Sequence, residues 1–550
     1  MLLGFAAATL LLVAVGFLVL RFGVAAVPLG PTLAAALSET VGSPDQDAAD
    51  GPAREATPEP GVLITPGVAS GEVTATSAVL WARMLGQGDL VFSVFTDPSR
   101  FASPLQSTVE TVWADHDYAA TVRFDGLAPD TRYIYAVQGR LADPNGAMSQ
   151  TTGLDSFGRF RTAPDPSGHR DFSFVFSGDV AGSGYCRSPE RGYPIFEAMT
   201  RLQPDFFIAN GDMIYADNSC PATNPDGQPN VPGAFRSVSS TAVDWTSYQQ
   251  VFDVYLQHWR YNRADLPFQR FLAETPMFVV WDDHEIINDS GASWSYWNAT
   301  SANRPGFSTL ASAARDAFFA YAPLVRDPAE PNRIYRRFSR GADADFFLLD
   351  TRSYRSRNDL ADTTENHKTM LGAEQRTWLT NGLARSTATW KIVVSSVPLS
   401  IPTGGLGAAI IGRDAWANGT SWDYSSQTGF ERELLDLLRS LDDSGVRNVV
   451  FLSGDAHRAV EMRYETDPNG DGRPLLFHEI GAGPLSAPTT RADPQLDPTL
   501  NPTLLYREAG LFNFGYVRIE RGGDVPHFTA DVRDSYGQPR PGSRLDLTPA

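Results

Sequence analysis

The stretch Phe172-Ser173-Phe174-Val175-Phe176-Ser177-Gly178-Asp179 is an apolar run that ends in a glycine and a carboxylate. A short segment rich in Phe and Val predicts a buried β-strand. Glycine lets the backbone turn sharply at the end of that strand, so the Asp179 side chain is expected to point into a cleft.

The same arrangement recurs three times further along the chain. One aspartate after a strand often only caps the next turn, but four acidic runs in order predict that strand ends deliver their side chains to one site. A cluster of Asp and His suits two neighbouring metal ions. The three further runs are Asn210-Gly211-Asp212, Trp281-Asp282-Asp283-His284-Glu285 and Ser453-Gly454-Asp455-Ala456-His457.

Strand-like and helix-like segments alternate through residues 165–540, which predicts an α/β layered domain. A short tail follows at 541–550. Strands are expected at 172–176, 205–209, 277–280, 346–349, 391–394 and 446–452, helices at 193–202, 311–321, 374–383 and 431–441, and β structure again at 515–532.

Residues 62–164 have a different pattern. Short β-rich segments at 78–82, 90–95, 133–137 and 159–162 are separated by turn residues. This predicts a small antiparallel β-sandwich. The region carries no evident chemistry, so we interpret it as a packing or positioning module.

The N-terminus is apolar and then acidic. Residues 2–20 carry no charge, nearly the length of about 20 residues that crosses a bilayer. We therefore favour a membrane anchor at 1–26 over a removed signal. Residues 27–61 are predicted to be a flexible linker, because 38–61 is rich in Pro, Ala and acidic residues.

Charge and cysteines bear on location and partners. The chain has 64 acidic and 45 basic residues, a net charge of −19, and no Lys/Arg-rich run. This argues against a nucleic-acid partner. Cys186 and Cys220 each follow an acidic run, and a disulfide between them is favoured over two free thiols. Arg21 alone would keep the following chain in the cytoplasm. The expected disulfide and the acidic linker instead favour an exported catalytic part, membrane-anchored or periplasmic/extracellular.

The third acidic run is the most specific. Neighbouring side chains at a strand end point in opposite directions, so one of Asp282 and Asp283 is expected to bind metal. His284 is then placed to hydrogen-bond an anionic substrate or protonate its leaving group, with Glu285 orienting it. Asn288 is close enough to contribute an amide oxygen.

Other candidates surround these runs. Asp455 and His457 are two residues apart, a spacing that puts both on one side of an extended segment. Tyr215 is a candidate phenolate ligand for a trivalent ion, although a core role is the alternative. Arg352 and Arg458 are candidate phosphate clamps, with structural ion pairing equally open.

These motifs resemble the PhoD-type alkaline phosphatases of the metallophosphoesterase superfamily. The resemblance covers about 62–534. It rests chiefly on Trp281-Asp282-Asp283-His284-Glu285 combined with Asn210-Gly211-Asp212-Met213-Ile214-Tyr215, and on Leu348-Leu349-Asp350-Thr351-Arg352-Ser353-Tyr354 and Leu452-Ser453-Gly454-Asp455-Ala456-His457.

The resemblance implies a four-layer, two-sheet core flanked by helices and preceded by a fibronectin/Ig-like β-sandwich. It implies Ca²⁺ and Fe³⁺ as cofactors, with other divalent ions open. Asp212 would bridge the metals, and Asp283 or Asn288 would take the place of the amide ligand. The metal ligands are then Asp179, Asp212, Tyr215, Asp283, Asn288, Asp455 and His457, and the catalytic residues are His284, Asp283 and Arg352.

Two departures from the family pattern stand out. Asp179 occupies a position where the best-known members have Cys, which leaves the identity of the redox-capable ion open. The twin-arginine export signal is missing, which leaves the export route open.

The expected function is hydrolysis of phosphoric monoesters or diesters by a metal-activated hydroxide. Its partner is a phosphorylated small-molecule, lipid or polymer substrate. Two alternatives are an exported binding protein with a degenerate scaffold and a metal hydrolase of another bond. The natural substrate and the oligomeric state are not readable from the sequence.

Overall fold

A computed structural model of the chain describes residues 64–97, 103–142, 148–152, 156–291, 305–358, 360–406, 409–410, 414–418, 429–491, 493–523 and 525–550. The expected anchor at 1–26 and linker at 27–61 lie outside these residues. In the described part, no helix combines the length and the apolar character that a membrane crossing needs. Almost all described residues belong to one compact unit, Ala49–Gly405 with Ile410–Ala550.

Two large sheets form the centre of this unit. The first has the order β23 (Leu545–Leu547), β22 (Pro526–Asp534), β21 (Asn513–Arg521), β9 (Phe172–Ser177), β10 (Phe206–Asn210), β11 (Met277–Val280), β1 (Ile64–Gly71), β2 (Ser77–Met84) and β5 (Ala119–Asp125). The second has the order β12 (Arg336–Arg340), β13 (Ala344–Leu348), β14 (Trp390–Val394), β17 (Val449–Ser453), β19 (Leu475–Gly481), β18 (Ala459–Thr466) and β20 (Pro502–Glu508).

The remaining elements are a smaller sheet, a strand pair and the helices. The smaller sheet contains β4 (Gln106–Val112), β3 (Gly88–Phe95), β6 (Arg132–Ala142) and β7 (Met148–Thr152), with β8 (Ser156–Arg161) also on β6, and β15 (Gly405–Leu406) pairs with β16 (Ala409–Ile410). The helices are α3 (Pro194–Leu202), α4 (Tyr248–Arg263), α5 (Leu266–Glu274), α7 (Phe307–Tyr321), α8 (Gly372–Arg385) and α9 (Glu431–Asp443), with 3₁₀ turns η2 (Ala114–His116) and η3 (Gly182–Gly184).

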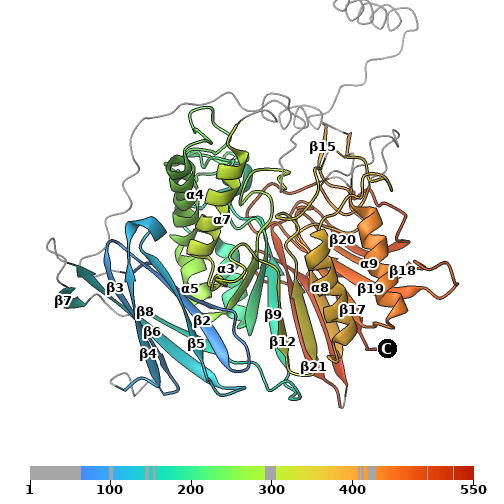
Figure 1. The fold of residues 1–550 in the computed structure, drawn as a ribbon, viewed down its shortest axis with the longest axis horizontal. Coiled ribbons are helices and arrows are strands. Elements are labelled where there is room, and N and C mark those ends of the chain that lie inside the picture. The colour runs from blue at the N-terminus through green and yellow to red at the C-terminus, as the bar shows by residue number, and fades with distance from the viewer. Residues whose placement is uncertain are drawn as a thin grey trace, which may run out of the picture. The chain divides into compact units, whose positions relative to one another are not determined.

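The two large sheets pack face to face through an aromatic core. Phe174 of β9 meets Phe346 of β13 edge-on at 5.4 Å between ring centroids, and both are fully buried. α3, α4, α5 and α7 cover the outer face of the first sheet, and α8 and α9 cover that of the second (Figure 1). The expected four-layer α/β architecture is therefore confirmed.

The N-terminal β-sandwich shares a sheet with the α/β part of the chain. β1 runs parallel to β11, with Gly71 opposite Met277, so β1, β2 and β5 extend the first sheet. The smaller sheet packs on these strands through an apolar core of its own. Gly71 is needed at the join, because a Cβ there would lie 2.6 Å from the Met277 carbonyl oxygen.

Parallel strands determine where the polar runs meet. β9, β10 and β11 are neighbouring parallel strands of the first sheet, and β13, β14 and β17 are parallel neighbours in the second. The carboxyl ends of each set therefore share an edge, where ligands bind in open α/β sheets.

Candidate metal centre

Four strand ends bring the predicted ligands together. Asp179 follows β9, Asp212 follows β10, Asp283 follows β11, and Asp455 follows β17 of the second sheet. All four side chains are at least half buried. The site is thus built across the edge of both sheets.

The backbone is bent sharply at these positions. Asp179, Asp212, Asp455 and His457 have φ of 65°, 52°, 60° and 50°, a left-handed conformation that non-glycine residues rarely adopt. Gly211 is required beside them, because a Cβ there would lie 2.5 Å from Cβ of Asp282. Such strain persists where the surrounding structure fixes it, as at functional sites.

One half of the centre contains Asp179, Tyr215 and His457. The Tyr215 hydroxyl lies 3.2 Å from Asp179 Oδ1 and 2.9 Å from His457 Nε2. His457 Nε2 lies 3.2 Å from the same Asp179 oxygen. The other imidazole nitrogen, Nδ1, is held by the Pro488 carbonyl at 2.5 Å, which leaves Nε2 facing the ligand cluster.

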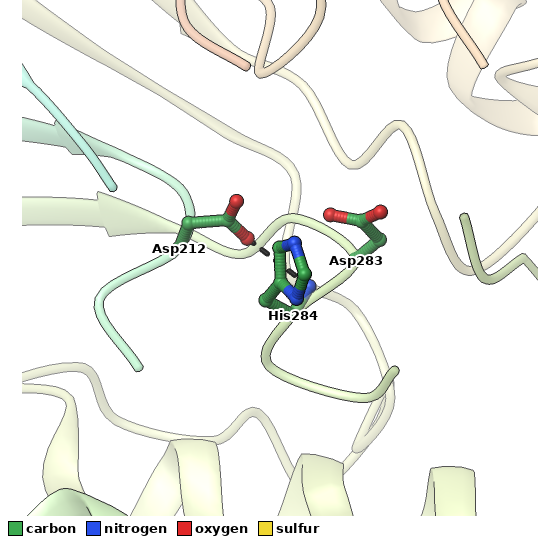
Figure 2. Close-up of side chains that lie close together, drawn as sticks. All are labelled: Asp212, Asp283 and His284. Carbon is green, nitrogen blue, oxygen red and sulfur yellow. Dashed lines mark hydrogen bonds between the residues drawn. The ribbon is translucent and has the colours of Figure 1, made fainter. Parts of the chain in front are cut away.

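The other half is centred on Asp283. Ligand atoms of Asp212, Asp283 and His284 lie within 4.8 Å of one another, as do those of Asp282, Asp283 and Asp455. Figure 2 shows the carboxylates of Asp212 and Asp283 on either side of His284. A third such group joins Asp283 to Asp289 and Asp414.

Several of the carboxylate oxygens have no hydrogen-bond donor, and a bound cation would compensate them. Asp179 Oδ2, Asp212 Oδ2, Asp283 Oδ1 and Asp455 Oδ2 are buried with no hydrogen-bond partner among the described residues. Burial and the neighbouring carboxylates raise the pKa of Asp212 and Asp455 well above the ordinary value. Oxygen ligands converging without donors are the environment that hard cations satisfy.

Asp217 is a site residue that the sequence analysis missed. Its Oδ1 lies 2.6 Å from His284 Nδ1, and the Tyr215 ring stacks on the imidazole at 3.9 Å. Burial would lower the pKa of His284, but the charges of Asp217 and Asp283 raise it to about 10. The one feature of the sequence that could have indicated this role is the position of Asp217, five residues after Asp212 in the same loop.

Arg352 is enclosed among carboxylates. It is fully buried, and its guanidinium donates to Asp282 Oδ1 at 2.5 Å and to both oxygens of Asp414 at 2.6 and 2.7 Å. Arg355 also donates to Asp414 at 2.8 Å. Burial would raise the pKa of Asp414, but these two arginines lower it to about 2. These contacts agree with the structural ion pairing that the sequence analysis left open for Arg352. They connect the loop after β13, which carries Arg352, to Asp282 after β11 and to Asp414.

Glu285 was expected to orient His284, but its carboxylate instead binds the backbone of the turns after β10 and β11. Its carboxylate accepts backbone N–H bonds from Asp212, Met213 and Asp282 at 2.9, 2.6 and 2.8 Å. Asn288 lies on the turn after β11, where its backbone N–H donates to Asp217 Oδ2 at 3.1 Å. Among the described residues, Asp283 belongs to each of the three carboxylate-rich groups that could hold a metal. The alternative of Asn288 as the amide ligand stays a prediction.

Two other candidates are placed by the structure. Cys186 and Cys220 form a disulfide with S–S 2.00 Å, as predicted. Arg458 is buried beside the His457 turn, with Nε 3.4 Å from the Ala456 carbonyl; its role as a phosphate clamp stays a prediction.

Comparison with known proteins gives consistent matches. The family described as PhoD-like phosphatase matches residues 174–525, and its N-terminal domain matches residues 50–164. Alkaline phosphatase D of Bacillus subtilis (strain 168) is 27% identical over 437 residues, which cover 73% of this chain and 66% of that protein, just under two thirds of its length.

Solved structures show the same fold. A structure of PhoD superposes with a TM-score of 0.67 at 21% identity and covers 90% of each chain. A purple acid phosphatase from yellow lupin (Lupinus luteus) seeds superposes with a TM-score of 0.53 at 13% identity, over 89% of this chain and 75% of that one.

Proposed function

This chain belongs to the PhoD-like phosphatase family, and on that premise we propose that it is a metal-dependent phosphoric ester hydrolase. The observation that carries the proposal is that Asp179, Asp212, Asp283 and Asp455 meet at the strand ends of both sheets, each with one buried oxygen that has no hydrogen-bond partner among the described residues. Two cations held there would activate a water and neutralise phosphate oxygens.

Asp179, Tyr215 and His457 would hold one cation, Asp283 and Asp455 the other, and Asp212 would bridge them. A phenol and an imidazole beside Asp179 suit a trivalent ion such as Fe³⁺, and the all-carboxylate half suits Ca²⁺. Other divalent ions, and further ions beside Asp289, fit the same donors.

His284 is the proposed general acid. Asp217 keeps the proton on Nδ1, so Nε2 is the nitrogen that can give a proton to the departing alkoxide. Arg352 holds Asp282 and Asp414 in place, and in this arrangement it positions the acidic loops instead of clamping phosphate.

The substrate class is a phosphorylated small molecule, lipid or polymer, with monoesters and diesters both open. We propose that the catalytic part is exported, which the Cys186–Cys220 disulfide supports because disulfides persist in oxidising compartments. The anchor at 1–26 would then keep it at a membrane.

The test combines elemental analysis with a substrate panel. Purified protein is expected to contain bound metal and to hydrolyse aryl phosphate or bis-aryl phosphate faster than an aryl ester. Asp212→Asn should lose both turnover and metal. Protein without bound metal would favour a binding scaffold, faster ester cleavage would favour a hydrolase of another bond, and full activity of Asp212→Asn would refute the site.

A further inference from the structure

A small cavity lies at the opposite end of the first sheet from the metal centre. It is lined by Phe172, where β9 begins, and by Asp205, just before β10, together with Arg161, Arg170 and Arg340. The other end of β9 lies about 16 Å away, at about 3.3 Å per residue, and Asp179 follows that end. The cavity volume of about 10 Å³ fits one particle the size of a water.

Arg340 is the residue that needs a partner there. It is 4% exposed, and one nitrogen donates to the Val73 carbonyl at 3.3 Å. Its Nε and Nη2 atoms have no hydrogen-bond partner among the described residues. The faces of Phe206 and Phe278 flank it at 4.5 and 5.5 Å, and burial lowers its pKa to about 10.

The neighbouring charges compensate Arg340 only in part, because Asp205 favours its charge and Arg170 opposes it. Arg170 donates to Asp205 at 2.9 Å, and Arg161 donates to Asp130 at 2.9 Å. Arg170 also lies 3.4 Å from Asp130. The three guanidinium groups that line the cavity are thus balanced by two carboxylates, Asp205 and Asp130, which are paired with Arg170 and Arg161 and leave one positive charge in excess. A buried donor without an acceptor costs free energy, and an unpaired buried charge costs more.

We propose that this cavity binds a monatomic anion of the halide class, held chiefly by Arg340. A water would satisfy the free N–H groups but not the excess positive charge, and a larger anion such as phosphate exceeds the volume. Because Arg161 ends the last strand of the β-sandwich and Arg340 ends β12, the anion would tie the N-terminal region to the catalytic sheets.

Thermal unfolding of the full chain tests the site. At constant ionic strength, replacing gluconate by chloride should raise the Tm of the wild type saturably, by about 2 °C. Arg340→Met should abolish the increase. The control Arg337→Met, on the same strand and paired with Asp345, should keep it. Equal Tm values of the wild type in the two salts would overturn the proposal.

A second measurement covers the case in which Arg340→Met does not fold. Wild-type crystals soaked in bromide should show an anomalous peak within hydrogen-bonding distance of the Arg340 guanidinium. Water density without such a peak would overturn the proposal. Both readouts are independent of the proposed hydrolase activity, because they need neither metal nor substrate.

Discussion

His284 is held in place by three residues of this chain, two of which contact its imidazole. Asp217 binds Nδ1 at 2.6 Å, and the Tyr215 ring stacks on one face. The His284 backbone N–H donates to Asp212 Oδ1 at 3.1 Å (Figure 2). Each contact comes from the loop after β10. The proposed acid and the proposed bridging ligand are therefore positioned by one another.

Asp217→Asn tests whether this arrangement serves catalysis. The amide would no longer stabilise the charged imidazole or fix its tautomer, so kcat should fall about 10–100-fold while bound metal is retained. Steady-state kinetics and elemental analysis measure both. Asp253→Asn, an exposed residue of α4, is the control. An unchanged kcat would exclude His284 as a proton donor supported by Asp217.

Which site residues were predictable follows from their place in the chain. Asp179, Asp212, Asp283 and Asp455 each come directly after a strand, so an apolar run indicated them. Asp414 has no such signal, because it reaches Arg352 across 62 residues of sequence. The partner of a buried charge depends on the tertiary fold, and local pattern does not encode it.

Arg352→Met separates a structural from a substrate-binding role. Removing the guanidinium would leave Asp282 buried without its cation and Asp414 with Arg355 alone, so unfolding free energy should fall by about 3–5 kcal/mol. Urea unfolding measures this. A variant of wild-type stability with a raised KM would instead show that Arg352 meets substrate, and Arg447→Met, a half-exposed residue, provides the baseline.

At the scale of elements, the loops that carry the proposed metal ligands are connected to one another by a buried carboxylate and by a disulfide. The Glu285 carboxylate joins the turns after β10 and β11 through three N–H bonds. The Cys186–Cys220 disulfide joins the loops that follow Asp179 and Tyr215. Both cysteines are buried, so the covalent link lies within the packed loops.

The double variant Cys186→Ala/Cys220→Ala tests the disulfide connection. The disulfide closes a segment with a sequence separation of 34, so its loss should lower the unfolding free energy by about 3–4 kcal/mol in the loop-entropy description. Denaturant unfolding of wild type with and without reductant should reproduce the difference. If the oxidised and reduced wild-type proteins are equally stable, the disulfide does not brace the loops.

Elements with a clear period were predicted and irregular ones were not. α7, α8 and α9 contain the expected helices and extend beyond them by a few residues. α4 was missed because aromatic residues weaken helix propensity and ten of its residues are buried. The N-cap residues of α4 and α5 were nevertheless recognisable in the sequence. The Ser247 side chain accepts from the Gln250 N–H at the start of α4, and the Asp265 side chain accepts from the Phe268 N–H at the start of α5.

At the scale of the whole molecule, the N-terminal region is joined to the catalytic sheets by buried charge as well as by β1. Asp117, before β5, is bound by Arg83 of β2 at 2.9 Å and by Arg260 of α4. Tyr321, which ends α7, donates to the same carboxylate. Paired in this way, the charge of Asp117 is compensated. The sandwich predicted from sequence is thus part of a continuous structure, a property that no segment shows alone.

Stability against alkaline pH depends on a carboxyl group that is buried without compensation. Glu461 of β18 is 2% exposed, and its Oε1 has no hydrogen-bond partner among the described residues. Burial, with a smaller contribution from Asp531, raises its pKa to about 8 from 4.5. Because the folded pKa lies above the unfolded one, the protonated group favours folding. That contribution is complete below pH 4.5 and is lost as the pH rises through 8.

Glu461→Gln should therefore stabilise the protein in a pH-dependent way. At pH 9 the variant should exceed the wild type by up to about 5 kcal/mol of unfolding free energy, since each pKa unit corresponds to about 1.4 kcal/mol, and at pH 4.5 the two should be equal. Urea unfolding at both pH values measures this. Glu465→Gln, exposed on the same strand, should show no such pH dependence. An equal difference at both pH values would mean that packing or hydrogen bonding, not the charge of Glu461, sets the cost of burying this side chain.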